Sequence, residues 1–213
     1  MEWLASFTDL VLHLDKHLVF FVQQYGDWVY ALLFAIIFTE TGVVVAPFLP
    51  GDSLLFVAGA LCVTEGMSLP LLMVLLVVAA ILGDAVNYSV GRWFGVALMT
   101  RTRLISPEKI KYTQDFFEKH GPKTIVIARF LPIVRTMAPF VAGFSGMQAK
   151  RFLTYNVSGG VLWVVSLTLA GYLFGNIPFI KNNLTAVILV IIFVSILPGI
   201  IAVLKARAAG LKN

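Results

Sequence analysis

The feature that most constrains this chain is its series of long apolar runs, which leaves few polar residues to cover a water-facing surface. Of the 213 residues, 59% belong to the hydrophobic set AVILMFWYC and 13% are charged. Soluble proteins average about half apolar and about a quarter charged residues. A soluble globule of this composition would expose large apolar patches. The sequence therefore predicts an all-α integral membrane protein, because helices satisfy their own backbone hydrogen bonds in lipid.

The runs and their interruptions predict a single membrane domain over residues 1–213. About 20 apolar residues cross a bilayer, and apolar stretches that prolines interrupt are interpreted as re-entrant hairpins. The predicted order is an interfacial helix at 1–24, a re-entrant hairpin at 28–63, a transmembrane helix at 69–91, an amphipathic helix at 107–120, a second re-entrant hairpin at 122–147, and transmembrane helices at 153–175 and 184–204.

Proline and glycine residues mark the predicted hairpin tips. In the first hairpin the apolar limb that follows the break, residues 53–63, is too short to span a bilayer. In the second, two arginines and two prolines make a lipid-facing helix unfavourable. The residues expected to shape the tips are Pro47, Pro50, Gly51, Pro132 and Pro139.

The net charge of +5 is explained by membrane orientation and requires no nucleic acid. Twelve of the 16 Lys and Arg residues lie in three places: the polar stretch 92–123, the Lys150-Arg151 junction and the tail after 204. The loop at 176–183 has few basic residues. The positive-inside rule then places the three basic regions and the C-terminus in the cytoplasm. The N-terminus is cytoplasmic if the 28–46 limb crosses fully, and outside if it only dips in.

Short segments repeat along the chain. Residues 56–59 (FVAG) recur at 140–143, and Tyr88 and Gly91 recur 84 positions later as Tyr172 and Gly175. Residues 48–50 (FLP) recur at 130–132. Chance matches of this length also arise in apolar chains, but each pair occupies a similar place in its unit. One complete crossing lies between the hairpins, so the pattern predicts an inverted repeat with facing hairpins, as in secondary transporters.

Four charged residues lie inside the apolar hairpins: Glu40, Asp52, Arg129 and Arg135. A central charge costs about 2.5–3.5 kcal/mol on translocon scales, so these residues must pair, bind a ligand or contact water. One interpretation is two ion pairs that tie the hairpins together. The other assigns proton uptake to the carboxylates and phosphate binding to the arginines, whose planar fork suits phosphate.

The next apolar span contains Asp84 and Asn87, which are expected to line a cavity. For Asp84 the alternative is a structural hydrogen bond. No Gly-rich phosphate loop, zinc-ligand spacing or nucleophile elbow occurs in the sequence. The sequence therefore predicts no catalytic residue, no metal site and no cofactor, and the protein is not expected to be an enzyme.

Three motifs resemble the DedA family of bacterial inner-membrane proteins, within the SNARE-associated Golgi protein or VTT-domain superfamily. They are Glu40 with PFLPGD at 47–52, GDAVNY at 83–88, and ARFLPIVRT at 128–136. The resemblance implies facing re-entrant hairpins, dependence on the proton motive force, and recycling of undecaprenyl phosphate across the cytoplasmic membrane for envelope synthesis. It also implies that Glu40 and Asp52 carry protons and that Arg129 and Arg135 act with them.

The leading hypothesis is a proton-coupled flippase in which Arg129 and Arg135 hold a lipid phosphate. Its expected partners are protons, the membrane and a lipid substrate, either undecaprenyl phosphate or another phospholipid. The alternatives are a proton-coupled ion or drug transporter, a phospholipid scramblase, and a scaffold in which the charges only hold the hairpins together.

Overall fold

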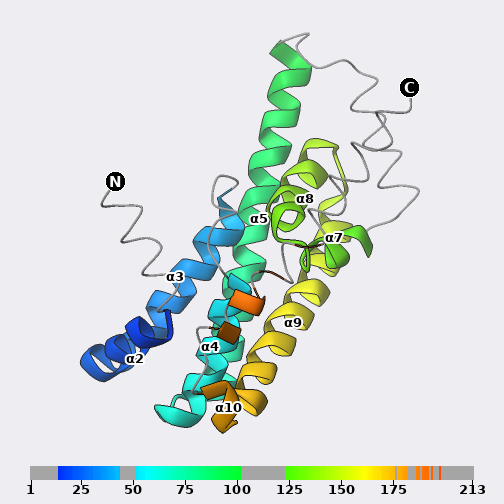
Figure 1. The fold of residues 1–213 in the computed structure, drawn as a ribbon. Helices are drawn as coiled ribbons and strands as arrows, with labels where there is room; N and C mark the ends of the chain where they lie inside the picture. The colour runs from blue at the N-terminus through cyan, green and yellow to red at the C-terminus, as the bar shows by residue number, and fades with distance from the viewer. Residues whose placement is uncertain are drawn as a thin grey trace, which may run out of the picture. The chain divides into compact units, whose positions relative to one another are not determined.

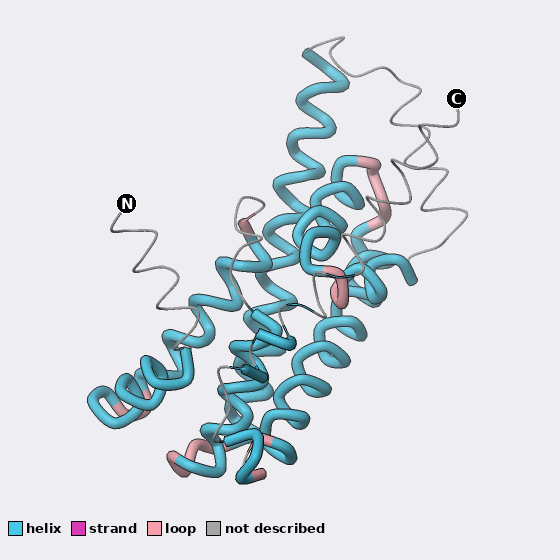
Figure 2. The backbone as a smooth tube through the Cα atoms, viewed as in Figure 1, coloured by secondary structure: helices cyan, strands magenta, loops and turns pink. Residues whose placement is uncertain are grey.

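The computed structural model describes residues 14–43, 51–101, 123–175 and 177–181, together with positions 186, 187, 189–191, 193 and 197. Within these residues all regular structure is helical (Figure 2), so the all-α prediction is confirmed for them. The chain divides into two compact units. Unit 1 comprises Met1–Phe34, Leu49–Leu76 and Val164–Asn213, and unit 2 comprises Ala35–Phe48 and Val77–Trp163.

The described residues form the following helices. They are α2 (Leu14–Tyr25), α3 (Trp28–Gly42), α4 (Gly51–Thr64), α5 (Leu69–Arg101), α7 (Lys123–Ala128), α8 (Pro132–Phe144), α9 (Ala149–Phe174) and α10 (Pro178–Lys181). Helices α3, α5 and α9 continue from one unit into the other. The predicted helix at 107–120, most of the span at 184–204, the start of the 1–24 helix, and Pro47 and Pro50 lie outside the described residues.

Among the residues that the structure describes, two helices are long and apolar enough to cross a membrane: Leu69–Phe94 within α5, and Ala149–Phe174, which is all of α9. Each has 26 residues, about 39 Å of helix, which exceeds the roughly 30 Å hydrocarbon core. α5 also exposes a stripe of aliphatic side chains four positions apart: Val74, Val78, Leu82, Val86 and Val90. This spacing puts them on one face of the helix, as expected for contact with lipid.

α5 is longer than its predicted span of 69–91. The basic residue Arg92 was expected to end it, but the helix continues to Arg101. A helix can continue from lipid into water without ending, because each turn satisfies its own backbone hydrogen bonds in either solvent. The change from apolar to basic residues therefore marks a change of environment and not a helix end.

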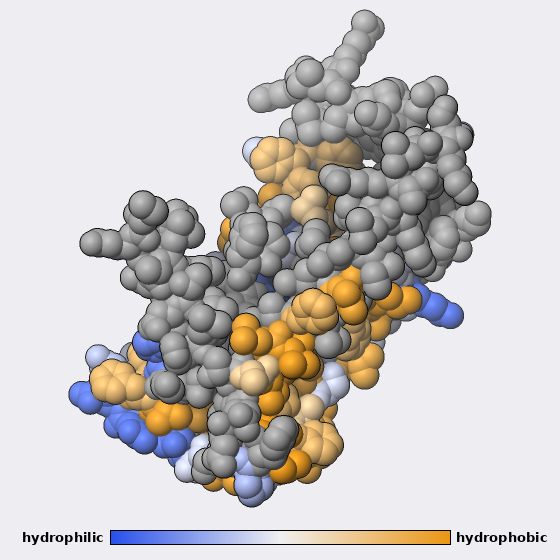
Figure 3. Space-filling view, in the orientation of Figure 1, coloured by the Kyte–Doolittle hydropathy of each residue, from blue (hydrophilic) through white to orange (hydrophobic). Residues whose placement is uncertain are grey.

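Unit 1 begins with α2, which turns into α3 at Gly26. Gly26 has a φ of +54°, and its N–H donates to the carbonyl of Val22 at 2.8 Å. This left-handed glycine is a common way to end a helix. Hydrophilic side chains gather over α2 (Figure 3), while Phe20 and Tyr25 of the same helix are exposed. The combination fits the interfacial helix that the sequence predicts.

Unit 2 contains a helix–turn–helix formed by α7 and α8, which pack against each other. The turn holds residues 129–131, and Pro132 is the first residue of α8, where its missing N–H is not needed. Pro139 was expected near the tip but lies inside α8. A proline inside a helix removes a single backbone hydrogen bond, and α8 continues past it to Phe144.

A small hydrophobic core supports this helix–turn–helix. Tyr88 of α5 stacks on Phe152 of α9 with ring centroids 4.3 Å apart. Its hydroxyl donates to the carbonyl of Met147. The other buried members of the core are Ile125, Ala128, Ala138 and Ala142. The core thus joins α5, α7, α8 and α9 within unit 2.

The repeated segments pack in the same way in the two units. In unit 2, α8 meets α5 where Gly143 lies against the carbonyl of Tyr88 (Figure 1). In unit 1, α4 meets α9 where Gly59 lies against the carbonyl of Thr168. α8 therefore packs on α5 in unit 2 as α4 packs on α9 in unit 1, so each unit contains segments from both halves of the repeat.

These contacts correct the register of the repeat. Gly91 lies against Phe140, whereas Gly171 lies against Phe56. Phe56 and Phe140 are 84 positions apart, as the sequence match predicts, but Gly91 and Gly171 are 80 apart. The predicted equivalence of Gly91 with Gly175 is therefore wrong by about one helical turn, because a sequence match does not report which residues face the neighbouring helix.

Candidate functional site

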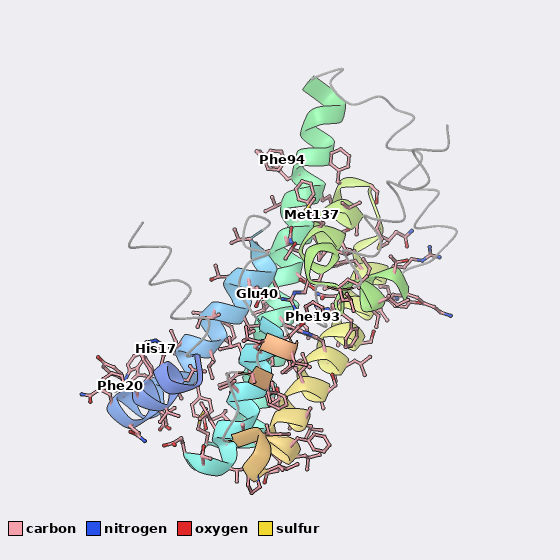
Figure 4. All side chains as sticks on the ribbon, viewed as in Figure 1. His17, Phe20, Glu40, Phe94, Met137 and Phe193 are labelled. Carbon is pink, nitrogen blue, oxygen red and sulfur yellow. The ribbon has the colours of Figure 1, made fainter. Side chains whose placement is uncertain are left out.

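An ion pair joins Glu40 and Arg135 inside unit 2. The Arg135 Nη2 donates to the Glu40 carboxylate. Glu40 lies near the end of α3 and is fully buried, and Arg135 lies in the first turn of α8 with 6% of its surface exposed. Figure 4 labels Glu40 on α3, next to α5. The pair therefore connects segments 95 residues apart.

A second ion pair joins Arg129 and Asp84. Arg129 lies in the turn between α7 and α8, and its Nη2 donates both to the Asp84 carboxylate of α5 and to the side-chain carbonyl of Asn156 on α9. Arg129 and Asp84 are 3% and 4% exposed. The sequence singled out Asp84 without a partner. The structure gives it Arg129.

The two pairs form one group, the charge cluster of Glu40, Asp84, Arg129 and Arg135. Asp84 interacts electrostatically with Arg135 as well as with Arg129. The guanidinium of Arg135 also lies over the ring of Trp163, with Cζ 4.9 Å from the centroid, within the range of a cation–π interaction. Two cations and two anions thus neutralise each other in a buried site.

Asn87 ties the helices around this cluster together. Its side-chain amide nitrogen donates to the backbone carbonyl of Thr41 at 3.2 Å and to that of Thr136 at 2.8 Å. Thr41 directly follows Glu40 on α3, and Thr136 directly follows Arg135 on α8. Asn87 therefore makes structural hydrogen bonds that hold the backbones on both sides of the ion pair, whereas the sequence predicted it only as a cavity-lining residue.

α9 forms one side of the Arg129 site. A β-carbon on Gly159 would lie 3.1 Å from Cδ and 3.3 Å from Nε of Arg129, and one on Gly160 would lie 3.4 Å from Nη1. Asn156, one turn earlier, is held by a 3.0 Å hydrogen bond from its amide nitrogen to the carbonyl of Ile81. Arg129 therefore lies across a part of α9 that has no side chain at two successive positions.

Two other predicted site residues, Asp52 and Gly51, belong to unit 1. They lie in the first turn of α4, where Asp52 is partly buried. The described residues contain no group of three His, Cys, Asp or Glu side chains that could hold a metal ion.

Three contributors to the cluster were missed from the sequence: Asn156, the Gly159-Gly160 pair and Trp163. A signal was present, because an asparagine buried in an apolar span needs a hydrogen-bond partner. Two successive glycines in the middle of a helix also lower its stability and favour a packing explanation. Nothing local, however, indicated that Arg129 was the partner.

Comparisons with known proteins agree with the family resemblance of the sequence motifs at 47–52, 83–88 and 128–136. The VTT domain matches residues 49–173. Protein DedA of Escherichia coli strain K12 is 51% identical, and the alignment covers 98% of this chain and 97% of that protein. The chain belongs to the DedA family. The resemblance seen in the motifs is therefore confirmed.

Other DedA-family relatives are named as membrane proteins. Inner membrane protein YqjA of E. coli strain K12 is 44% identical over 71% of this chain and 70% of its own length. An uncharacterized membrane protein of Mycobacterium leprae strain TN is 42% identical over 86% of this chain and 85% of its own. No solved structure matches the chain. Family membership and the two membrane-length helices identify this DedA-family chain as a membrane protein.

In a DedA-family membrane protein the depth of the charge cluster matters. Asp84 lies within about one turn of the middle of the apolar stretch 69–94, and Gly160 lies near the middle of α9. Single charges there cost several kcal/mol, and removing one member of a buried ion pair costs about 3–5 kcal/mol. The arrangement avoids these costs by pairing, so any ligand must replace a partner of the same charge.

Proposed function

We propose that this DedA-family protein is a proton-motive-force-dependent flippase that returns undecaprenyl phosphate across the cytoplasmic membrane for envelope synthesis. The observation that carries the proposal is that both buried arginines of the charge cluster are paired with carboxylates. A carboxylate is a partner that a proton can neutralise and a phosphate can replace.

The chemistry is an exchange of anions at a fixed guanidinium. When Glu40 or Asp84 takes up a proton it loses its charge, and its arginine is left without a counterion in a medium of low dielectric constant. A phosphate monoester carries a charge of about −1.5 to −2 near neutral pH and presents three acceptor oxygens. It binds the planar guanidinium fork in two places. Protonation of the carboxylate therefore favours phosphate binding, which couples the two processes.

The substrate tail and the membrane arrangement follow from the same picture. The polyprenyl chain stays in lipid, and only the phosphate enters the site. The helix–turn–helix of α7 and α8 is one re-entrant hairpin, and the region from α3 to α4 is the other. The protein crosses the membrane several times and has a cytoplasmic C-terminus. Asp52, in the first turn of α4, is the further proton carrier in this proposal.

A reconstituted transport assay tests the proposal. In proteoliposomes containing undecaprenyl phosphate, an imposed pH gradient should drive net movement of the lipid phosphate by the wild type. Arg129→Ala and Arg135→Ala should each lower the rate at least about tenfold, as expected for loss of a hydrogen-bonded charge contact. Arg151→Ala is the matched control, because Arg151 is exposed on α9. Equal rates in the arginine variants and the control would refute the phosphate site.

The ion pairs themselves favour a second candidate, a scaffold whose charges only join helices. A charge swap separates the two functions. If the pairs are structural, Glu40→Arg combined with Arg135→Glu should restore growth and envelope integrity in a strain lacking the protein. A proton-coupled flippase should not tolerate the swap, because the proton carrier and the phosphate ligand would change places. Saturable uptake of a small solute without lipid movement would instead indicate an ion or drug transporter.

A further inference from the structure

Arg129 has two partners on one nitrogen, and only one of them can change its charge. Its Nη2 carries two N–H groups, one donating to the Asp84 carboxylate and the other to the Asn156 side-chain carbonyl. A carboxylate loses its charge when it binds a proton, whereas an amide stays neutral over the whole physiological pH range. The two hydrogen bonds therefore differ in what a proton does to them.

The surroundings of Arg129 also differ on its two sides. Its Nε lies beside Gly159, is buried, and has no hydrogen-bond partner among the residues that the structure describes. A side chain at 159 would press on this edge of the guanidinium, since its β-carbon would lie 3.3 Å from Nε. Two adjacent N–H donors on one edge form the fork that a phosphate recognises. Because position 159 is glycine, no β-carbon presses on Nε from α9.

We propose that Asn156, with Gly159 and Gly160, is the permanent positioning wall of the Arg129 site, whereas Asp84 is its exchangeable partner. The inference rests on the proposed function, which supplies the phosphate. When Asp84 is neutralised and phosphate takes its place, Asn156 keeps the guanidinium in the same orientation. Asn156 is therefore a positioning residue that acts through Arg129, and its own position is held by the hydrogen bond to Ile81.

The charged groups near this wall come from every helix packed around it in unit 2. They are Asp84 of α5, Arg129 of the α7–α8 turn, Arg135 of α8 and, through Arg135, Glu40 of α3. A second carboxylate at position 156 would add a negative charge to this group and compete with phosphate for Arg129.

Asn156→Asp is the decisive variant because its two protonation states do different things. When the introduced carboxyl group is ionised, it is an acceptor only and repels both Asp84 and phosphate. When it is protonated, it donates one hydrogen to the Ile81 carbonyl and accepts from Arg129, which reproduces the pattern of asparagine. The alanine side chain of Asn156→Ala has neither the donor for the Ile81 carbonyl nor the acceptor for Arg129 at any pH. A merely structural role would change the unfolding midpoint of the aspartate variant with pH, but it would not give an acid-dependent recovery of the KM for the lipid phosphate.

The experiment measures lipid phosphate transport in proteoliposomes between about pH 5 and 8, with each variant compared with the wild type at the same pH. Near pH 8, Asn156→Asp should raise the KM for undecaprenyl phosphate about tenfold or more, with a smaller change in kcat. This difference should diminish toward pH 5. Asn156→Ala should stay impaired throughout. Thr154→Asp is the matched control, because Thr154 is exposed on the same helix.

Gly159→Ala provides an independent test that adds no charge. Its methyl group would press on Nε and on the backbone of Val126, so KM should rise at every pH, whereas Ser158→Ala on the exposed face should not change it. The inference would be overturned, with the flippase left intact, if the KM of Asn156→Asp divided by the wild-type KM did not change with pH. A KM equal to that of the wild type in Asn156→Ala would have the same consequence.

A wild type that moves no lipid at any pH would instead refute the proposed function. In that case the positioning of Arg129 by Asn156 can still be tested. The thermal unfolding midpoint of Asn156→Asp, relative to that of the wild type, should recover as the pH falls. If the difference between the two midpoints did not change with pH, the proposed positioning role of Asn156 would be refuted as well.

Discussion

The carbonyl oxygen of Tyr88 lies 2.0 Å from the position that a β-carbon on Gly143 would take, so α5 and α8 touch through their backbones. Close contact through small residues is a common way for helices to associate in membranes, where lipid removes the hydrophobic driving force. On α5, Tyr88 directly follows Asn87 and lies about one helical turn after Asp84. The position of α8, and with it that of Arg135, therefore depends on the glycine at 143.

Gly143→Ala should destabilise unit 2. The added methyl group meets backbone atoms of α5, which cannot move aside as a flexible side chain would. Overpacking of this kind costs about 1–3 kcal/mol, which thermal unfolding in detergent should detect as a lower midpoint. Gly42→Ala is the control, because its methyl group would meet Gly83 at an ordinary 3.4 Å. Equal midpoints for the two variants would contradict the close backbone contact.

The Glu40–Arg135 pair should show the signature of a buried ion pair. Glu40→Leu leaves the guanidinium of Arg135 without this counterion and should lower the free energy of unfolding by about 3–5 kcal/mol. The double variant Glu40→Leu with Arg135→Met should regain most of that stability, because neither charge is left. A double-mutant cycle by chemical unfolding measures the coupling, and additive effects would argue against the pair. Transport should be lost in Glu40→Leu, in the single variant Arg135→Met that completes the cycle, and in the double variant.

Asn87→Ala should weaken the packing of α3 and α8 on α5. The substitution leaves the carbonyls of Thr41 and Thr136 without the amide that bonds them. Each buried polar group that loses its partner costs about 1–3 kcal/mol. Hydrogen exchange at residues 40–42 and 136–138 should accelerate. Ser89→Ala is the comparison, because its hydroxyl bonds only within its own helix, to the carbonyl of Ala85, and it should leave exchange unchanged.

Asp84→Asn should separate proton coupling from phosphate binding. The amide keeps a side chain of the same shape beside Arg129 but cannot be neutralised by a proton, so phosphate binding should lose part of its pH dependence. In proteoliposomes, movement of undecaprenyl phosphate down its own gradient should continue, while movement driven by a pH gradient should fall. Asp27→Asn, at the exposed turn before α3, should behave as the wild type. An unchanged response to the pH gradient would remove Asp84 from the coupling mechanism.

Much of the architecture was predictable because it depends on local properties. The apolar runs placed α3, α4, α5 and α9 to within a few residues, except for the C-terminal extension of α5. Pro132, which was expected only at a hairpin tip, is the first residue of α8, because its fixed φ and missing N–H suit a first helical turn. Pro139 was assigned to the wrong place, because a proline inside a membrane helix can resemble a break.

The chemistry of the site was predictable in kind but not in its pairing. Glu40, Arg129 and Arg135 were recognisable because a charge in an apolar segment is costly wherever it lies along that segment. By that measure the sequence grouped Asp52 with Glu40 as the carboxylates of the arginines, and it gave Asp84 no charged partner. The choice depends on contacts between residues 45 and 95 positions apart, which no local pattern specifies.

By itself, then, the sequence determined the solvent of this protein, its helical class and the residue types of its buried site. Tertiary structure decided that Asp84 neutralises Arg129, that Asn156 shares the same nitrogen, and that α5 packs on α8 while α4 packs on α9. The physical reason is that burial and propensity act on each residue separately. An ion pair or a glycine contact exists only where the fold brings two distant backbones together.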